Sequence, residues 1–270
     1  MKLFNCHTHT IYSHDGSSSI TDLCNFAQSN RLLGFAVTDH CDCEYASDIK
    51  MRDNLNIAFN ETEKIKKQFS GNLIISNGVE IGEAIINKGF ADSIISSNNY
   101  DVVLGSVHAV RIESFDMPFS VIDFSSFDDI FIEKYINQYF TDLFETTKTT
   151  DFDILSHLTV VLRYIVHKFN RKVDIQKQLP IIEKILLQVI KRNKCLEVNT
   201  SGFSMGYLMP DTDIIKLYKS LGGEKISIGS DAHIADHLTD GLFDAAAILK
   251  SIGFDKLIYY IQRKEIEYPI

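Results

Sequence analysis

Short apolar segments alternate along the chain with longer segments in which apolar residues recur at helical spacing. Seven apolar segments have the length of strands that are buried on both faces. They end near Asn5, Thr38, Gly78, Leu104, Leu155, Val198 and Gly229. Between them, six amphipathic segments predict helices over residues 20–28, 54–69, 127–146, 175–191, 211–221 and 240–249.

This alternation of strands and helices predicts a parallel sheet in an α/β protein. Seven strands in a chain of 270 residues favour a barrel close to the (β/α)8 type, although the alternation alone also fits an open sheet. The chain contains four prolines and no Gly/Ser-rich tract that would mark a linker. We therefore expect a single domain that spans residues 1–270.

The composition narrows the class of protein. A hydrophobic fraction of 45% with 23% charged residues is ordinary for a folded protein and excludes intrinsic disorder. The first residues lack the pattern of a signal peptide, and no run approaches the roughly 18 apolar residues of a membrane span. Five cysteines, an odd number in a chain of this size, are typical of reduced thiols. We expect a cytoplasmic protein without a membrane partner.

The charge argues against one class of partner. The chain has 27 basic and 36 acidic residues, which gives a formal net charge of −9. Phosphate backbones repel a protein of this charge, so nucleic acid is not the expected partner. The sequence does not indicate an oligomeric state.

Histidines and carboxylates follow the predicted strands directly. Six of the seven strands are followed by such residues: His7, His9, Asp39, His40, Glu80, His108, His157, Asp231 and His233. The seventh strand leads into the segment from Glu197 to Ser201. Because the carboxyl ends of parallel strands form the active-site face of α/β folds, we expect these side chains to meet in one crevice.

Imidazole and carboxylate groups together are the ligand set of Zn, Mn or Fe. In an extended segment residues i and i+2 point to the same side, so His7 and His9 can bind one ion, and Asp231 and His233 can do likewise. An isolated histidine is usually hydrogen-bonded in a core or on a surface, but six at strand ends favour a metal site.

The sequence gives weaker evidence for a nucleophilic serine or a cysteine-bound zinc. Ser106 and Ser230 lie at strand ends without a nucleophile-elbow motif, and the C-x-C pair Cys41 and Cys43 lacks zinc-ribbon spacing. Among the other histidines, we expect His167 at the surface, His237 in a loop near the rim, and His14 beside the site.

An ordered set of motifs resembles the polymerase and histidinol phosphatase (PHP) superfamily between residue 2 and about residue 240. The motifs are His7-x-His9, Ser13-His14-Asp15-Gly16, Thr38-Asp39-His40, Gly78-Val79-Glu80, Gly105-Ser106-Val107-His108 and Gly229-Ser230-Asp231-Ala232-His233. The resemblance implies a distorted (β/α)7 barrel and a site for three divalent metal ions. It assigns His7, His9, Glu80 and Asp231 to one ion, Glu80, His108 and His157 to a second, and Asp15, His40 and His233 to the third.

The segment from Glu197 to Gly202 resembles the histidinol-phosphatase branch of this superfamily. The resemblance implies metal-dependent hydrolysis of L-histidinol phosphate in histidine biosynthesis, and places Asn199 and Ser201 among the substrate contacts. Phe203-Ser204-Met205 follows where relatives often carry a basic residue, and Thr159 stands where the branch tends to show an acid. Neither departure changes an expected metal ligand.

Substrate contacts follow from the chemistry of a phosphate ester. Guanidinium groups bind phosphate in a bidentate manner, which makes Arg163 the first candidate and Arg111 the second. Asp231 or His233 is the candidate for protonating the leaving alkoxide. The acidic segment from Asp42 to Glu44 would suit a cationic substrate.

Two other functions remain open at this stage. A PHP phosphodiesterase or exonuclease would share the metal ligands but would need a basic groove, which the composition does not favour. A PHP module without catalysis would have lost ligands, whereas the set here is complete.

Overall fold

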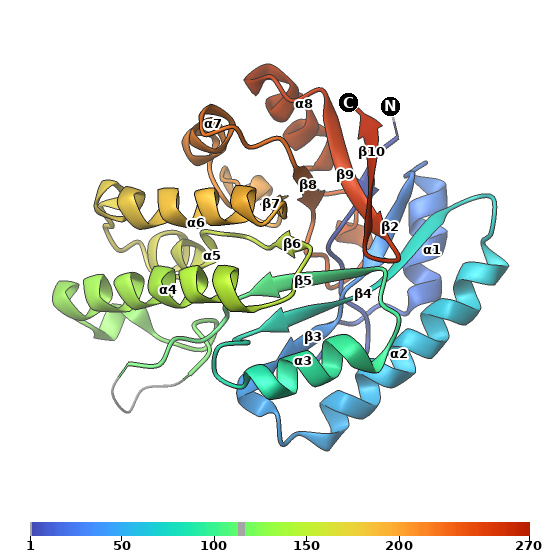
Figure 1. Cartoon of the computed structure of the whole chain (residues 1–270), viewed down its shortest axis with the longest axis horizontal. Coiled ribbons are helices and arrows are strands. Elements are labelled where there is room, and N and C mark those ends of the chain that lie inside the picture. Colours follow the sequence, from blue (N-terminus) through green and yellow to red (C-terminus); the bar gives the residue numbers. More distant parts are fainter. Residues whose placement is uncertain (1, 113–116) are drawn as a thin grey trace.

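A parallel sheet forms the centre of the molecule in the computed structural model, which describes residues 2–112 and 117–270 (Figure 1). The order is β1-β2-β4-β5-β6-β7-β8, with β3 beside β4. The strands are β1 Phe4–Asn5, β2 Gly34–Val37, β3 His40–Asp42, β4 Ile74–Gly82, β5 Val102–Ser106, β6 Ile154–Leu155, β7 Cys195–Asn199 and β8 Ile226–Gly229. All pairs in this sheet are parallel, as the alternation of strands and helices predicts.

The last strand returns to the first. The amide of Cys6 donates to the carbonyl of Ile228 at 2.9 Å, and the amide of Asp231 donates to the carbonyl of His7 at the same distance. The sheet is therefore a nearly closed barrel, and the expected distorted barrel is confirmed in place of the open sheet. The carboxyl ends of its strands face one end of the barrel, where the polar motifs begin.

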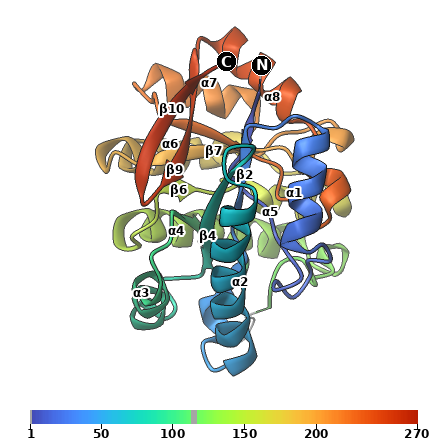
Figure 2. The ribbon, with the colours of Figure 1, turned by 90° about the vertical axis from the view of Figure 1, so that its right-hand side faces the viewer.

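Helices surround the barrel (Figures 1 and 2). They are α1 Ile20–Ser29, α2 Ile49–Gln68, α3 Lys88–Ser97, α4 Asp129–Thr149, α5 Val160–Leu162, α6 Leu179–Lys191, α7 Thr212–Ser220 and α8 Leu242–Ile252. A π-helical turn, η3 Arg163–Lys168, continues α5. Short 3-10 turns are η1 Cys43–Tyr45, η2 Phe124–Ser126, η4 Ile175–Gln178, η5 Phe203–Met205 and η6 Ala235–His237.

Several observed elements were not expected, among them the helical segment of α5 and η3 over residues 160–168. The expected set lacks α3, whose sequence is rich in serine and contains glycine, and β3, which has three residues with polar ends. It also ends before a C-terminal hairpin of β9 Lys256–Ile261 and β10 Lys264–Pro269. The hairpin packs on the barrel: the rings of Tyr259 and Phe4 stack with centroids 4.4 Å apart, and Ser76 donates to the carbonyl of Tyr260.

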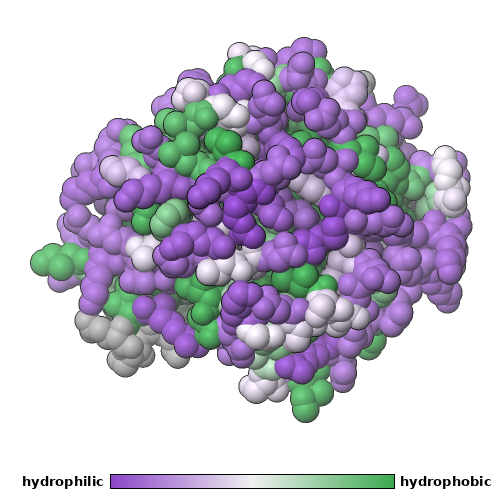
Figure 3. Space-filling model, in the orientation of Figure 1, coloured by the Kyte–Doolittle hydropathy of each residue, from purple (hydrophilic) through white to green (hydrophobic). Residues whose placement is uncertain are grey.

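Strands and helices together supply a continuous apolar core, and polar residues dominate the surface visible in Figure 3. All five cysteines are buried and none is joined in a disulfide. Among the described residues, no helix combines the length and apolar character that crossing a membrane requires.

Candidate metal centre

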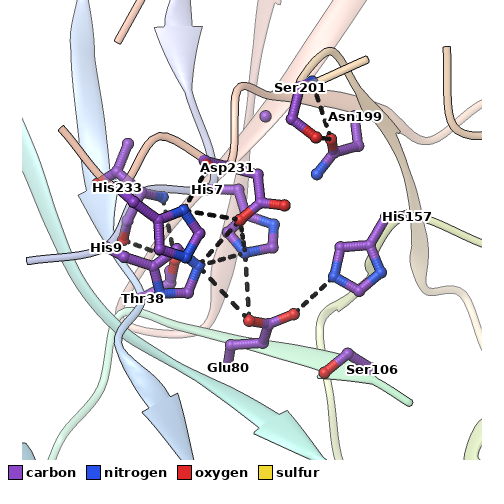
Figure 4. A network of polar contacts seen from close by, with 12 residues as sticks. His7, His9, Thr38, Glu80, Ser106, His157, Asn199, Ser201, Asp231 and His233 are labelled. Carbon is purple, nitrogen blue, oxygen red and sulfur yellow. Dashed lines mark hydrogen bonds and ion pairs between the residues drawn. The ribbon is translucent and has the colours of Figure 1, made fainter. Parts of the chain in front are cut away.

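The nine expected metal ligands come together at the carboxyl ends of the strands. They are His7, His9, Asp15, His40, Glu80, His108, His157, Asp231 and His233, and each lies within 4 Å of another member of the set. His7 and His9 follow β1, Glu80 lies within β4, and His157 follows β6. Figure 4 shows the side chains from these separate elements pointing toward one another.

Glu80 is the centre of the cluster and is completely buried. Its Oε2 atom lies 3.0 Å from His40 Nδ1 and 3.3 Å from His7 Nε2. Its Oε1 atom lies 2.8 Å from His157 Nε2 and 3.3 Å from His108 Nε2. The two oxygens thus serve two different groups of histidines, which is the geometry that a bridging carboxylate needs.

The other two carboxylates extend the cluster toward solvent. Asp231 Oδ1 lies 3.2 Å from His9 Nε2 and 3.8 Å from His233 Nδ1. Asp15 reaches His233 Nε2 at 3.2 Å and His40 Nε2 at 3.7 Å. The side chain of Asp15 is 45% exposed and that of His233 is 29% exposed, so this part of the cluster is open to an incoming ligand.

The donor atoms inside the cluster fit a set of divalent cations. Four buried atoms make no hydrogen bond of normal geometry within the described chain: His40 Nδ1, Glu80 Oε2, His157 Nδ1 and His233 Nε2. Three of them face another expected ligand at 3.0 to 3.2 Å, where a metal ion would be shared. The Nε2 atoms of His7 and His9 face each other at 3.0 Å, which requires a shared proton or a cation between them. Donor atoms of His7, His9 and Glu80 lie within 4.8 Å of one another, as do those of His40, Glu80 and His108. Imidazole and carboxylate donors in this arrangement are suited to divalent metal ions.

The carboxylates are held in their charged form. Burial by itself would raise the pKa of Glu80, but the facing His7, His108 and His40 lower it well below its usual range. In the same way His7 and a hydrogen bond from His9 outweigh burial and hold the pKa of Asp231 well below its usual range. Both carboxylates therefore stay ionised at neutral pH, as metal ligands must be.

A second layer of residues orients the ligands. Glu197 is completely buried, and its Oε1 lies 2.8 Å from His7 Nδ1 while its Oε2 accepts from the amide of His157 at 2.7 Å. Asp42 Oδ1 lies 3.0 Å from His108 Nδ1. Partners of this kind set the tautomer and the ring orientation of metal-binding histidines.

Sequence reasoning missed these roles. It used Glu197 only as part of a motif, and it considered Asp42 only as part of an acidic segment that would suit a cationic substrate. The structure shows that Asp42 is also buried and bonded to His108. The available signal was the need of every ligating histidine for a partner at its second ring nitrogen. Sequence spacing does not reveal which carboxylate fills that need, because Asp42 and His108 meet only through the pairing of β3, β4 and β5.

Comparison with known proteins agrees with this geometry. The family model of the PHP domain matches residues 5–201 of the chain. The chain belongs to the PHP domain family. One curated relative is a probable histidinol-phosphatase of Thermotoga maritima, 28% identical over 257 residues that cover 94% of each chain. Another is a histidinol-phosphatase of Lactococcus lactis, 25% identical over 268 residues that cover 95% of this chain and 94% of the relative.

Solved structures share the PHP fold. The histidinol phosphate phosphatase of Lactococcus lactis, solved with zinc, L-histidinol and phosphate, has a TM-score of 0.79 and 24% identity. It covers 98% of this chain and 99% of its own. A histidinol phosphatase described as putative, from Listeria monocytogenes, has a TM-score of 0.72 and 17% identity over 89% of this chain and 99% of its own. These structures confirm the barrel over almost the whole chain.

The expected substrate contacts divide into two groups in this PHP structure. Arg163 donates from a terminal guanidinium nitrogen to Ser201 Oγ at 3.0 Å, and Ser201 Oγ donates to Asn199 Oδ1 at 2.7 Å. Asn199 Nδ2 lies 3.3 Å from Glu197 Oε2, which connects the three residues to the metal ligands. Among the described residues, Arg111 is not bonded to this network; it is exposed, and its positive charge by itself would lower the pKa of Glu44.

The remaining histidines are not among the expected ligands, and His14 borders the cluster. It is 70% exposed and its Nε2 lies 3.7 Å from Asp15, and donor atoms of His14, Asp15 and His40 lie within 4.8 Å of one another. His167 is exposed and stacks on Tyr207, and His237 bonds to Asp240.

Proposed function

We propose that this PHP protein is a histidinol-phosphatase that hydrolyses L-histidinol phosphate to L-histidinol and phosphate in histidine biosynthesis. The observation that carries the proposal is the cluster of nine ligands around Glu80, joined through Glu197 and Asn199 to the Arg163–Ser201 pair. Relatives that bear this name match almost the full length of the chain, which supports the same reaction.

We propose that the cluster holds three divalent ions, Zn, Mn or Fe according to availability. His7, His9, Glu80 and Asp231 would hold one ion, and Glu80 would share a second with His108 and His157. Asp15, His40 and His233 would hold the third. When bound, such ions lower the pKa of a water molecule and offset the charge of a phosphoryl group.

The chain itself would bind and orient the ester. Arg163 is held toward the cluster by its bond to Ser201, and its planar fork suits two phosphoryl oxygens. Asn199 fixes Ser201 by accepting from both its amide and its hydroxyl. Asp231 or His233, on the open side of the cluster, stays the proposed donor of a proton to the leaving alkoxide.

The wider setting of the protein is proposed on the same basis. The chain would act as one domain, and buried free cysteines suit the reducing conditions of the cytoplasm. A PHP phosphodiesterase or exonuclease is the competing enzyme, and a net charge of −9 disfavours its nucleic-acid substrate.

A panel of phosphate esters tests the proposal. The purified, metal-analysed protein is assayed with L-histidinol phosphate, phenyl phosphate, glycerol phosphate and a single-stranded oligonucleotide. We expect the highest kcat/KM with L-histidinol phosphate. Faster cleavage of the oligonucleotide would identify the competing enzyme, and no activity on any ester in a fully metallated protein would identify a non-catalytic module.

A further inference from the structure

Three carboxyl groups lie close to one another beside His108. Asp42 ends β3, Glu44 lies in the turn η1 that follows, and Glu83 directly follows β4. We call these three residues the acidic trio. Asp42 is 8% exposed and Glu83 is 1% exposed, while Glu44 is half-buried at the rim.

Two oxygens of the trio are buried without a partner. Glu83 Oε1 accepts from the amides of His108 and Ala109, but its Oε2 makes no hydrogen bond within the described chain. Glu44 Oε2 is buried and unbonded in the same way. Buried polar atoms are nearly always bonded in folded proteins, and an unpartnered carboxylate oxygen is costly. A pair of such oxygens on one side of a site indicates a missing donor.

The cations near the trio are engaged elsewhere or exposed. His108 bonds to Asp42, and Arg111, whose charge by itself would lower the pKa of Glu44, is exposed to solvent. Burial, followed by the charge of Asp42, raises the pKa of Glu44 to about 7, which reports the crowding of negative charge around it. A cation brought by a ligand would relieve this crowding.

The proposed substrate carries such a cation. Its phosphate would lie over the metal ligands near Arg163 and Ser201, which follow β6 and β7. The trio follows β3 and β4 and contacts His108, an expected metal ligand that follows β5. An ammonium group stays charged throughout the neutral range, whereas an imidazole with a pKa of about 6.5 is mostly neutral there.

We infer that Glu44, supported by Asp42 and Glu83, receives the ammonium group of the substrate and makes the enzyme selective for amino-alcohol phosphates. The inference rests on the proposed function and adds to it the recognition of the end of the substrate that does not react. Glu44 is the member to test, because Asp42 and Glu83 also bond to His108.

The test compares Glu44→Gln with Glu183→Gln, which removes the same charge from an exposed position on α6. Each metal-analysed protein is assayed with L-histidinol phosphate and phenyl phosphate, and O-phosphoethanolamine is measured as a competing ligand. A charge-assisted hydrogen bond predicts a loss of about ten- to a hundredfold in kcat/KM for L-histidinol phosphate, mainly in KM. The affinity for O-phosphoethanolamine should fall in parallel. The kcat/KM for phenyl phosphate should stay within about twofold of the wild-type value.

Several results would overturn the inference. An equal loss of kcat/KM with L-histidinol phosphate and phenyl phosphate, or no loss with either, would show that Glu44 does not bind the ammonium group. A loss on L-histidinol phosphate with unchanged O-phosphoethanolamine binding would assign Glu44 to the imidazole, and loss of a metal equivalent would assign the trio to a metal ion. If the wild type does not prefer L-histidinol phosphate over phenyl phosphate, the proposed function itself fails, independently of Glu44.

Discussion

Glu80 is the one expected ligand that connects two parts of the site, because its two oxygens face separate groups of histidines. Glu80→Gln keeps the size of the side chain and removes the charge that would offset two cations. We expect the loss of at least one metal equivalent and of most of kcat, measured by metal analysis and phosphatase assay. Glu145→Gln, at a side chain on α4 that is 43% exposed, is the control. Wild-type metal content in Glu80→Gln would show that Glu80 is not a bridging ligand.

Glu197 orients two of the expected metal ligands but is not itself one of them. It bonds to His7 Nδ1 and to the amide of His157, so Glu197→Gln can satisfy only one of these contacts with an oxygen. We expect metal affinity to fall about ten- to a hundredfold, as for other partners of metal-bound histidines. Titration of the metal-free variant against a competing chelator measures this, and excess metal should restore much of the activity. Unchanged affinity would contradict the positioning role.

Arg163 provides the sharpest test of phosphate binding. Its bond to Ser201 leaves the second terminal nitrogen for an incoming ligand. Arg163→Ala should lower kcat/KM by about ten- to a hundredfold at unchanged metal content, since a charged hydrogen bond contributes roughly 1.5–3 kcal/mol. Arg163→Lys should recover only part, because an ammonium lacks the planar fork. Retention of kcat/KM within twofold in Arg163→Ala would move the phosphate contact elsewhere, with Arg111 as the next candidate.

For individual residues, the sequence predicts the metal ligands better than the residues that orient those ligands. His7, His9 and Glu80 could be identified because they follow strands, and strand ends of a parallel barrel converge. Glu83 could not, because its role depends on a bond to the amide of His108 that forms only when β4 and β5 pair. The short β3, which positions Asp42, carries no apolar alternation that would reveal it.

At the scale of elements, periodicity predicts the long amphipathic helices and leaves the weak ones out. The helix expected over residues 127–146 is α4, Asp129–Thr149, and its buried face follows the apolar repeat. The helix α3 has a buried face of only Phe90, Ala91 and Ile94, and its serines give weak helix propensity. The hairpin of β9 and β10 lies beyond the last strand that the barrel pattern requires, so the alternation gives no reason to expect it.

Helix α4 contains a carboxyl group whose environment opposes its charge. Burial, with Glu145 adding to it, raises the pKa of Asp142 to about 6. The unfolded chain titrates near pH 3.9, so the folded state binds more protons between about pH 4 and 6 and loses stability as pH rises through that window. Asp142→Asn keeps an acceptor for Gln138 and removes the penalty. We expect a gain of about 1 kcal/mol at pH 7.5, after allowing for solvent screening, and a smaller gain at pH 4.5.

Chemical denaturation at the two pH values measures the gain. Asp53→Asn, at an exposed position of α2, is the matched control and should show no comparable pH dependence. A gain in Asp142→Asn that is equal at both pH values would contradict the electrostatic explanation.

For the whole molecule, the apolar core and the metal cluster make separate contributions to the stability of the fold. The core extends around the barrel and the helices, so the fold should survive the loss of metal. In the metal-free protein, protons bound to the histidines would offset the negative charge of the cluster. Burial would lower the pKa of His40, but Glu80 and Asp42 raise it to about 9, so in the metal-free protein an imidazolium can replace a metal charge.

This substitution of protons for metal predicts a pH-dependent effect of chelation. A histidine whose pKa rises from about 6.5 in the unfolded chain to about 9 stabilises the fold fully below pH 6.5 and ceases to do so as pH passes 9. Metal binding strengthens over the same range, because protons no longer compete for the ligands. The difference in Tm between metal-loaded and metal-free protein should therefore widen from pH 6.5 to pH 9, while chelation abolishes activity at both. Restoring the metal should restore both activity and Tm. A constant difference in Tm, or full activity in protein shown to be metal-free, would contradict the assignment of these nine residues to metal.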